Sequence, residues 1–164
     1  MEIFRILLGV STVLVSLVAG FVFAFAVIVM PGIRALGDKE FLRAFQVMDR
    51  VIQNNQPLFM AVWLGSVLAL LATAILGAMQ LSGVNRIILI GAFAIYLLGV
   101  QIPTAAINVP LNNELQTREL DTLNEAELAE AREKFEPRWI RWNTIRTFIS
   151  ILVTAVLVLL IFRT

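Results

Sequence analysis

The sequence predicts an all-α membrane protein, an antiparallel bundle of four transmembrane helices with amphipathic helical segments in the two long loops. Of its 164 residues, 59% are hydrophobic and 15% are charged, whereas a soluble domain has about 45–50% apolar and about 25% charged residues. The apolar residues form four blocks, at about 6–30, 57–79, 87–107 and 144–162, and none of these contains Asp, Glu or Lys. At about 1.5 Å per residue each block can cross a hydrocarbon layer of about 30 Å. We therefore expect one membrane domain over residues 1–164.

The first block ends near Ala24-Phe25-Ala26, which resembles the cleavage site of a signal peptide. The apolar region of a signal peptide is usually about 7 to 15 residues long, and this block is longer. We expect it to form the first helix of the bundle.

The blocks are joined by one short and two long connections. Residues 80–86, QLSGVNR, form the short one, in which Ser82-Gly83 can turn the chain. The long connections, residues 31–56 and 108–143, lie together on the opposite membrane side, here called the loop side.

Each long connection contains an amphipathic helical segment. The first carries apolar residues at helical spacing, namely Phe41, Phe45, Met48 and Ile52. The second carries a similar stripe, namely Leu128, Phe135, Trp139 and Trp142. We expect both stripes to lie on the membrane surface or at the end of the bundle rather than to form grooves for a partner.

Prolines and capping residues predict where these helices begin and end. Pro31 is expected to end the first helix, and Pro137 to kink or restart the last one. Asp38 is a candidate N-cap for the first amphipathic helix. The second has two candidate capping boxes, Thr122 with Glu125 and Asn124 with Glu127.

Small residues recur every fourth position on the first two helices. The first series is Thr12, Ser16, Gly20 and Ala24; the second is Ala61, Gly65, Ala69, Thr73 and Gly77. Small residues at this spacing let two backbones approach closely, which holds membrane helices together by packing. The pattern predicts a tight contact between the first and second helices.

The distribution of Lys and Arg indicates the orientation in the membrane. The loop side holds ten of these cations and the terminal side only three, Arg5, Arg86 and Arg163. Because cations are retained on the cytoplasmic side, we expect an inner-membrane or equivalent protein with its long loops in the cytoplasm and both termini outside.

The composition excludes several classes of site. The chain has no cysteine and no histidine. This removes disulfides, thiolate and imidazole metal ligands, haem ligation by these residues and every nucleophile–histidine pair. Since no acidic residues cluster within the spans, we predict no metal site. A net charge of +1 without a basic arm argues against nucleic acid as a partner.

Polar residues gather at the loop-side ends of the helices. Gln101, Thr104 and Asn108 share one face of the third helix, and Asn143 and Arg146 approach from the fourth. A guanidinium in the first turn of a span needs partners or a route to water. Its candidate partners are the amide oxygens of Asn108, Asn112 and Asn143. Amides, an arginine and aromatic residues at one end of a bundle suit a planar, lipophilic molecule that carries oxygen.

Each of these residues also has a purely structural interpretation. The segment Asn108-Val109-Pro110 can simply stop the third helix, and Asn112 or Asn113 can cap the next one. The tryptophans fit an aromatic belt at the membrane interface. Arg146 can be a structural clamp.

Four segments carry a resemblance to a known family. FAFAVIVMPGIRAL, PLFMAVWLG, NVPLNNEL and RWIRWNTIRT, in this order and spacing, resemble the anthrone-oxygenase-like family of small four-helix membrane proteins. The likeness extends over about residues 7–160. Two positions depart from the family pattern, because Gln56 precedes Pro57 where Asn is frequent, and Asp49 precedes Arg50 where Asn is frequent.

The resemblance implies an oxygenase that converts the methylene of an anthrone into the ketone of an anthraquinone without metal or flavin. Under this hypothesis Arg146, Asn143 and Asn108 stabilise the oxyanion of an enolate. Asp49 is the candidate general base. The candidate substrate-binding residues are Gln101, Asn112, Asn113, Trp142, Trp139 and Gln56.

The alternative is a non-catalytic membrane protein, either a module that binds a lipid or quinone or a small subunit of a larger assembly. An enzyme predicts a partly apolar pocket between helices that Arg146 and Asn108 face, whereas a subunit predicts no pocket. Ion transport is disfavoured because no acid lies within a span. The lipid bilayer is the expected partner, a lipophilic aromatic or quinone-like molecule is the candidate ligand, and a homo-oligomer stays open.

Overall fold

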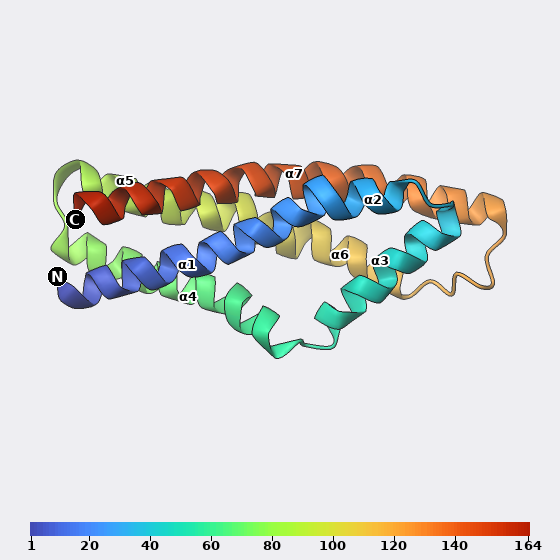
Figure 1. Ribbon diagram of the computed structural model, residues 1–164, viewed down its shortest axis with the longest axis horizontal. Coiled ribbons are helices and arrows are strands. Elements are labelled where there is room, and N and C mark those ends of the chain that lie inside the picture. Colours follow the sequence, from blue (N-terminus) through green and yellow to red (C-terminus); the bar gives the residue numbers. More distant parts are fainter.

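Four long helical rods make up most of the protein (Figure 1). The computed structural model describes residues 1–164 and contains only helices and connecting segments. The rods cover Glu2–Arg34, Pro57–Gln80, Gly83–Gln116 and Glu125–Arg163, and each is long and apolar enough to cross a membrane. Both termini and the α4–α5 turn lie at one end, and the two long connections lie at the other (Figure 1). The four-span antiparallel bundle is therefore confirmed.

The rods divide into shorter elements. The first comprises α1 (Glu2–Ala24), η1 (Phe25–Val29) and α2 (Met30–Arg34), where η marks a π-helical segment. The separate helix α3 (Asp38–Gln53) precedes the second rod, α4 (Pro57–Gln80). The third comprises α5 (Gly83–Tyr96), η2 (Leu97–Gln101), η3 (Thr104–Asn108) and α6 (Val109–Gln116), and α7 (Glu125–Arg163) is the fourth.

The membrane part of the bundle is held by packing around α1. This helix packs along both α4 and α7, and α5 packs on α7. Most of the buried residues between them are apolar, including Phe4, Leu8, Leu70 and Leu157. Two hydroxyl pairs also cross this core: Ser11 and Thr73 lie 2.8 Å apart, and Ser66 and Tyr96 lie 2.7 Å apart.

The small-residue pattern forms a close contact over only part of its length. Thr73 and Gly77 are buried between α4 and its neighbours, whereas Gly20 and Ala61 are exposed. The predicted contact between the first and second helices is present, and near the loop side aromatic residues make it, since Phe21 contacts Phe59 and Trp63. Toward its connection with α3, α4 diverges from α6 and α7 (Figure 1).

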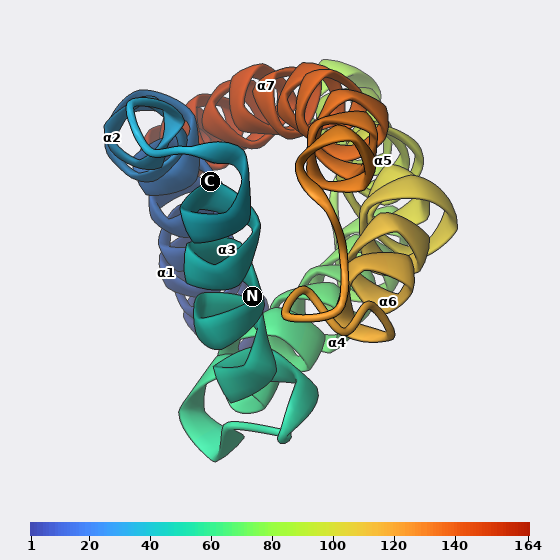
Figure 2. The same cartoon turned by 90° about the vertical axis from the view of Figure 1, so that its right-hand side faces the viewer.

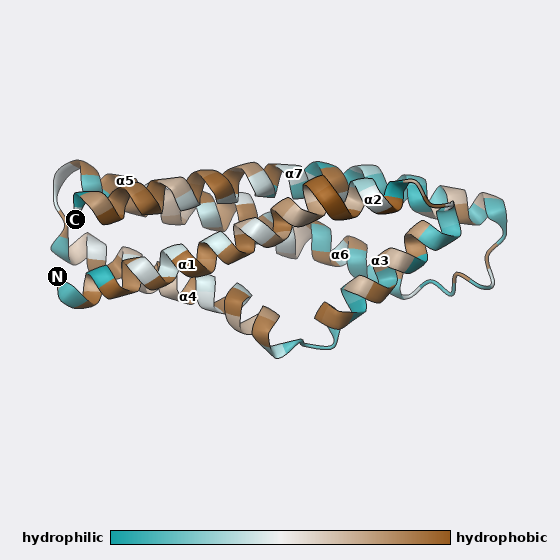
Figure 3. Ribbon diagram, in the orientation of Figure 1, coloured by the Kyte–Doolittle hydropathy of each residue, from teal (hydrophilic) through white to brown (hydrophobic).

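The amphipathic segments form a second layer at the loop-side end, here called the head region (α2, α3, α6 and the first half of α7). Its core is separate from the membrane core and includes Phe41, Phe45, Leu115, Phe135 and Trp139. The stripes predicted from the sequence thus pack against each other at the end of the bundle. Figure 3 shows hydrophilic residues at this end and, fewer, around the termini, with hydrophobic residues dominating the length between them.

Ion pairs connect the start of α3 to α7. Arg132 binds Asp38 at 3.0 Å and Glu136 at 2.7 Å, and Glu136 also accepts from Arg34 at 2.8 Å. The guanidinium of Arg132 lies 4.3 Å from the centre of the Phe41 ring. These contacts hold the α2–α3 turn against the last helix.

The structure corrects three predictions about helix ends. The first helix continues through Pro31 to Arg34, and the third continues through Pro110 to Gln116, so neither proline stops its helix. Pro137 lies inside an unbroken α7. The N-cap of α3 is Gly37, with Asp38 as its first residue. The capping box of Asn124 with Glu127 is confirmed.

A π-helical segment precedes each of three prolines by two residues. The segments end at Val29, Gln101 and Asn108, and the prolines are Pro31, Pro103 and Pro110. Within a regular α-helix a proline ring clashes with the carbonyl four residues earlier and removes one hydrogen bond. The wider π turn changes which carbonyls face that ring. This is our explanation of why these helices continue past their prolines.

Candidate functional site

A cavity of about 220 Å³ lies between the membrane core and the head region. Seven elements contribute to it, and Figure 2 views α1, α3, α4, α6 and α7 around one another from the head end. Its lining residues are Phe21, Phe25, Phe45, Asp49, Ile52, Phe59, Met60, Trp63, Thr104, Asn108, Val109, Asn112, Trp139 and Arg146. An apolar cavity of about 150 Å³ is enough to hold benzene, so this space accepts a larger ring system.

Aromatic rings form most of the wall. Phe59 and Trp63 are stacked, with centroids 5.4 Å apart and planes 25° apart. Trp139 contacts Phe25 at 5.6 Å and Phe45 at 5.2 Å between centroids. Flat side chains held by one another in this way leave a slot suited to a planar molecule.

Arg146 supplies the positive charge on this wall and is only 4% exposed. Its Nη1 donates to the Thr104 hydroxyl at 2.8 Å, and its Nη2 donates to Oδ1 of Asn143 at 3.0 Å. Nε has no hydrogen-bond partner. Asn143 is itself held in place, since its Nδ2 donates to the Val22 carbonyl at 3.0 Å. The guanidinium, which lines the cavity, is thus held by a hydroxyl of η3 and an amide of α7.

Asn108 lies on the same wall and is 2% exposed. Its Nδ2 makes one long hydrogen bond, 3.4 Å, to the Trp139 carbonyl, and its Oδ1 has no partner. No hydrogen bond joins Asn108 to Arg146. Asn108, the predicted partner of Arg146 on the third rod, is therefore wrong. Thr104, one helical turn earlier, accepts the hydrogen bond instead.

Asp49 forms the second polar group of the cavity and is 4% exposed. Its carboxylate accepts from Nδ2 of Asn112 at 2.7 Å, from Nε2 of Gln116 at 3.0 Å and from Nε2 of Gln53 at 3.1 Å. Oδ1 of Asn112 in turn accepts from the indole N–H of Trp139 at 2.9 Å. The amides after the third block therefore dock α3 on α6 and orient one wall of the cavity.

The other predicted residues lie outside the lining. Gln101 sits behind the wall, where its Oε1 accepts from the indole of Trp63 at 2.9 Å. Gln56 caps α4 by accepting from the backbone N–H of Phe59. Asn113 is exposed and accepts from Gln53 at 2.8 Å, and Trp142 is half-buried without lining the cavity.

The sequence prediction missed Thr104 as a site residue and most of the aromatic wall. The signal for the wall was present, since Phe21 and Phe25 are spaced by four residues, as are Phe59 and Trp63. Such a spacing places two side chains on one helix face without indicating what that face meets.

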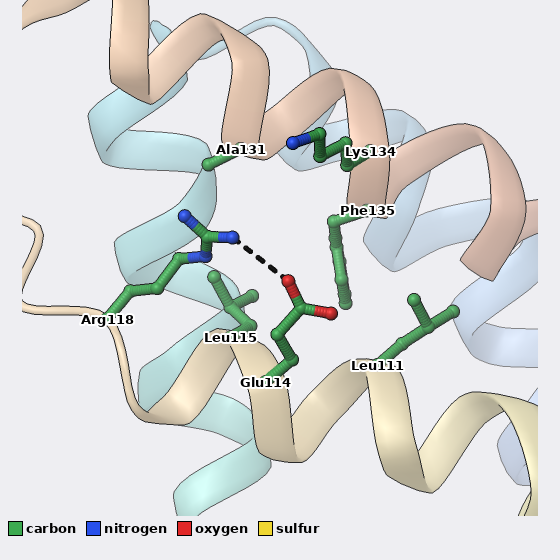
Figure 4. Close-up of a pocket in the computed structure, with 7 residues that line it drawn as sticks. All are labelled: Leu111, Glu114, Leu115, Arg118, Ala131, Lys134 and Phe135. Atoms are coloured by element: carbon green, nitrogen blue, oxygen red, sulfur yellow. Dashed lines mark hydrogen bonds and ion pairs between the residues drawn. The ribbon is translucent and has the colours of Figure 1, made fainter.

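A smaller hollow lies in the head region between α6 and α7 (Figure 4). Its volume is about 20 Å³, and Arg118 closes it by donating to Glu114 at 2.9 Å. This space holds about one water molecule. It is a packing gap and adds nothing to the candidate site.

No curated protein and no solved structure matches this chain. The family model described as anthrone oxygenase matches residues 48–156, which is 109 of the 164 residues. The match includes Asp49, Asn108 and Arg146, and the four membrane-spanning rods agree with it. The chain is therefore a membrane protein of the anthrone oxygenase family.

Proposed function

We propose that the protein is a cofactor-independent oxygenase that oxidises the methylene of a planar, lipophilic, anthrone-like substrate to a ketone. Dioxygen supplies one oxygen atom to the ring carbon, and the other leaves with the two methylene hydrogens as water. The observation that supports this most is the buried guanidinium of Arg146 in the lining of an aromatic slot, where no carboxylate pairs with it. Membership of the anthrone oxygenase family points to the same chemistry.

The first step is loss of a proton from the methylene, which gives an enolate. Its negative charge develops on the ketone oxygen, and a fixed guanidinium stabilises that oxygen without reorganising. Arg146 is suited to this role because Thr104 and Asn143 fix its orientation. Attack of dioxygen on the enolate carbon and loss of water complete the reaction.

Asp49 is the residue proposed to accept the proton. Asp49 lines the cavity and accepts a hydrogen bond from Asn112 of the third rod. Arg146 donates to Thr104, which lies eight residues before Asn112 on that rod. Eight residues of helix span roughly 12 Å. The ketone oxygen and the methylene lie on opposite edges of the central ring of an anthrone, so each can face its own polar group.

The test is oxygen uptake by the purified protein in lipid vesicles supplied with anthrone. We expect anthraquinone to form in equal amount to the dioxygen consumed, faster than in vesicles without protein. Asp49→Asn is expected to lower this rate by about 10²–10⁴-fold, the usual range for loss of a general base. Glu119→Gln, on the exposed segment after α6, is the control and leaves the rate unchanged. A wild-type rate equal to that of empty vesicles refutes the oxygenase proposal.

One observation favours a second candidate, a module that binds a quinone-like molecule without turning it over. Three amide donors occupy Asp49, and a carboxylate offers about four lone-pair positions, so little capacity is left for a proton. This candidate predicts saturable binding of anthraquinone, measured by quenching of tryptophan fluorescence, together with no oxygen uptake from anthrone.

A further inference from the structure

Several seams around the cavity are closed by contacts between side chains. The α1–α4 seam is closed where Phe21 meets Phe59, with centroids 5.1 Å apart. The α3–α7 seam is closed by Phe45 and Phe135, 4.6 Å apart. The indole of Trp63 on α4 reaches η2 through its hydrogen bond to Gln101.

The third rod is joined to α3 and α7 by polar contacts. Asn112 and Gln116 bind Asp49 of α3, at 2.7 and 3.0 Å. Thr104 accepts from Arg146 of α7 at 2.8 Å. A ligand can therefore pass between these elements only by breaking hydrogen bonds.

The seam between the first turns of α4 and the η3–α6 segment has no such closure. The helix α4 packs on α1 and α5 but makes no extended contact with η3 or α6. In Figure 1 the start of α4 is visibly displaced from α6. Both sides of this seam contribute to the cavity lining, Phe59 and Met60 from α4 and Val109 from α6.

The outer surface on both sides of this seam is apolar. Val109 is 41% exposed, and on the same rod Ile102 is 48% exposed. Leu58, in the first turn of α4, is 73% exposed. Exposed apolar surface beside a membrane-spanning helix indicates contact with lipid rather than water.

We propose that the seam between α4 and η3–α6 is a lateral portal through which a lipophilic ligand passes between the bilayer and the cavity. The portal lies just inside the loop-side membrane interface, because α4 begins there after Asn54-Asn55-Gln56. A planar aromatic that partitions into the bilayer reaches the slot without crossing water or the polar head region. The inference rests on the proposed function for the identity of the ligand, and on geometry alone for the position of the portal.

Whether the portal faces lipid or water can be tested without measuring enzymatic activity. The chain has no cysteine, so Val109→Cys carries a single bimane fluorophore. In vesicles we expect lipid labelled with a nitroxide near its headgroup to quench this fluorophore more strongly than aqueous iodide. Glu133→Cys in the exposed part of α7 is the control and is expected to respond to iodide only. Quenching of position 109 by iodide alone, as at position 133, overturns the portal.

Passage through the portal is tested by narrowing it. Val109→Phe is expected to slow both binding and release of anthraquinone, added in vesicles and followed by tryptophan quenching, by at least about tenfold. A narrower passage raises the barrier in both directions alike. Ile151→Phe, on a lipid-facing position of α7 that is 45% exposed, is the matched control.

The two measurements separate the portal from the function. An unchanged binding rate in Val109→Phe refutes the portal even if anthrone is oxidised. If anthraquinone does not bind the wild-type protein, the proposed function fails, and the quenching at position 109 still decides whether the seam faces lipid.

Discussion

At the residue scale, the site depends on how Arg146 is held. The side chain is 4% exposed within a membrane-spanning rod, and its two terminal nitrogens are committed to Thr104 and Asn143. A planar guanidinium can make both contacts with a fixed orientation, whereas an ammonium group cannot reproduce that geometry. Arg146→Lys is therefore expected to lower anthrone turnover by about 10²–10³-fold, as for loss of an oxyanion-stabilising donor. The fold is retained, which an unchanged Tm in detergent checks.

The matched control is Arg138→Lys, because Arg138 is exposed on the same helix and does not line the cavity. Arg146→Ala is expected to lower both turnover and Tm, since Asn143 and Thr104 lose a donor in a buried site. Full turnover in Arg146→Lys, with Arg138→Lys also active, contradicts a role for the guanidinium in the reaction.

At the element scale, two glycines of α4 have different surroundings. A Cβ added at Gly77 lies 2.2 Å from the Leu89 side chain and 3.2 Å from Phe4, both of which are fully buried. A Cβ at Gly65 lies 3.5 Å from Leu14, which is an ordinary contact. We expect Gly77→Ala to destabilise the bundle by about 1–3 kcal/mol through overpacking. Gly65→Ala is expected to leave the Tm in detergent within about a degree of wild type, and equal Tm values for both variants contradict this account of α4 packing.

At the scale of the whole molecule, the arrangement predicts which positions are accessible from each membrane side. Glu40 and Glu119 lie at the loop-side end, and Ser82 lies in the α4–α5 turn; all three are exposed. With a membrane-impermeant maleimide on intact cells, we expect Ser82→Cys to react, and Glu40→Cys and Glu119→Cys to react only after lysis. The reason is the excess of Lys and Arg on the loop side. Reaction of Glu40→Cys and Glu119→Cys but not Ser82→Cys reverses the proposed orientation, and reaction of all three from one side contradicts the four-span bundle.

Several features of the fold followed directly from local sequence. The four spans follow from uninterrupted apolar blocks, and the start of α7 from the capping box of Asn124 with Glu127. The stripe that contains Phe41 and Phe45 correctly indicated the buried face of α3. These features depend on residues a few positions apart, so the sequence alone contains the whole signal.

The prolines show where local rules were insufficient. Pro31 was expected to end the first helix, and a helix stop was one interpretation of Asn108-Val109-Pro110, but both rods continue through π-helical turns. A proline within a regular α-helix costs about 3 kcal/mol, and in these rods a wider π turn precedes each proline. The three π segments also contain or adjoin Phe25, Gln101, Thr104 and Asn108, so the irregular turns coincide with the cavity wall.

By itself, the sequence determined the class of the protein, its four spans, the polarity of the loop-side ends and the family. It also indicated that amides, an arginine and aromatic residues gather there. Only the tertiary structure decided that Thr104 rather than Asn108 binds Arg146, that Asn112 links Trp139 to Asp49, and that α4 makes no extended contact with η3 or α6. The physical reason is that periodicity places side chains on a helix face, whereas the rotation and splay of packed helices decide which faces meet.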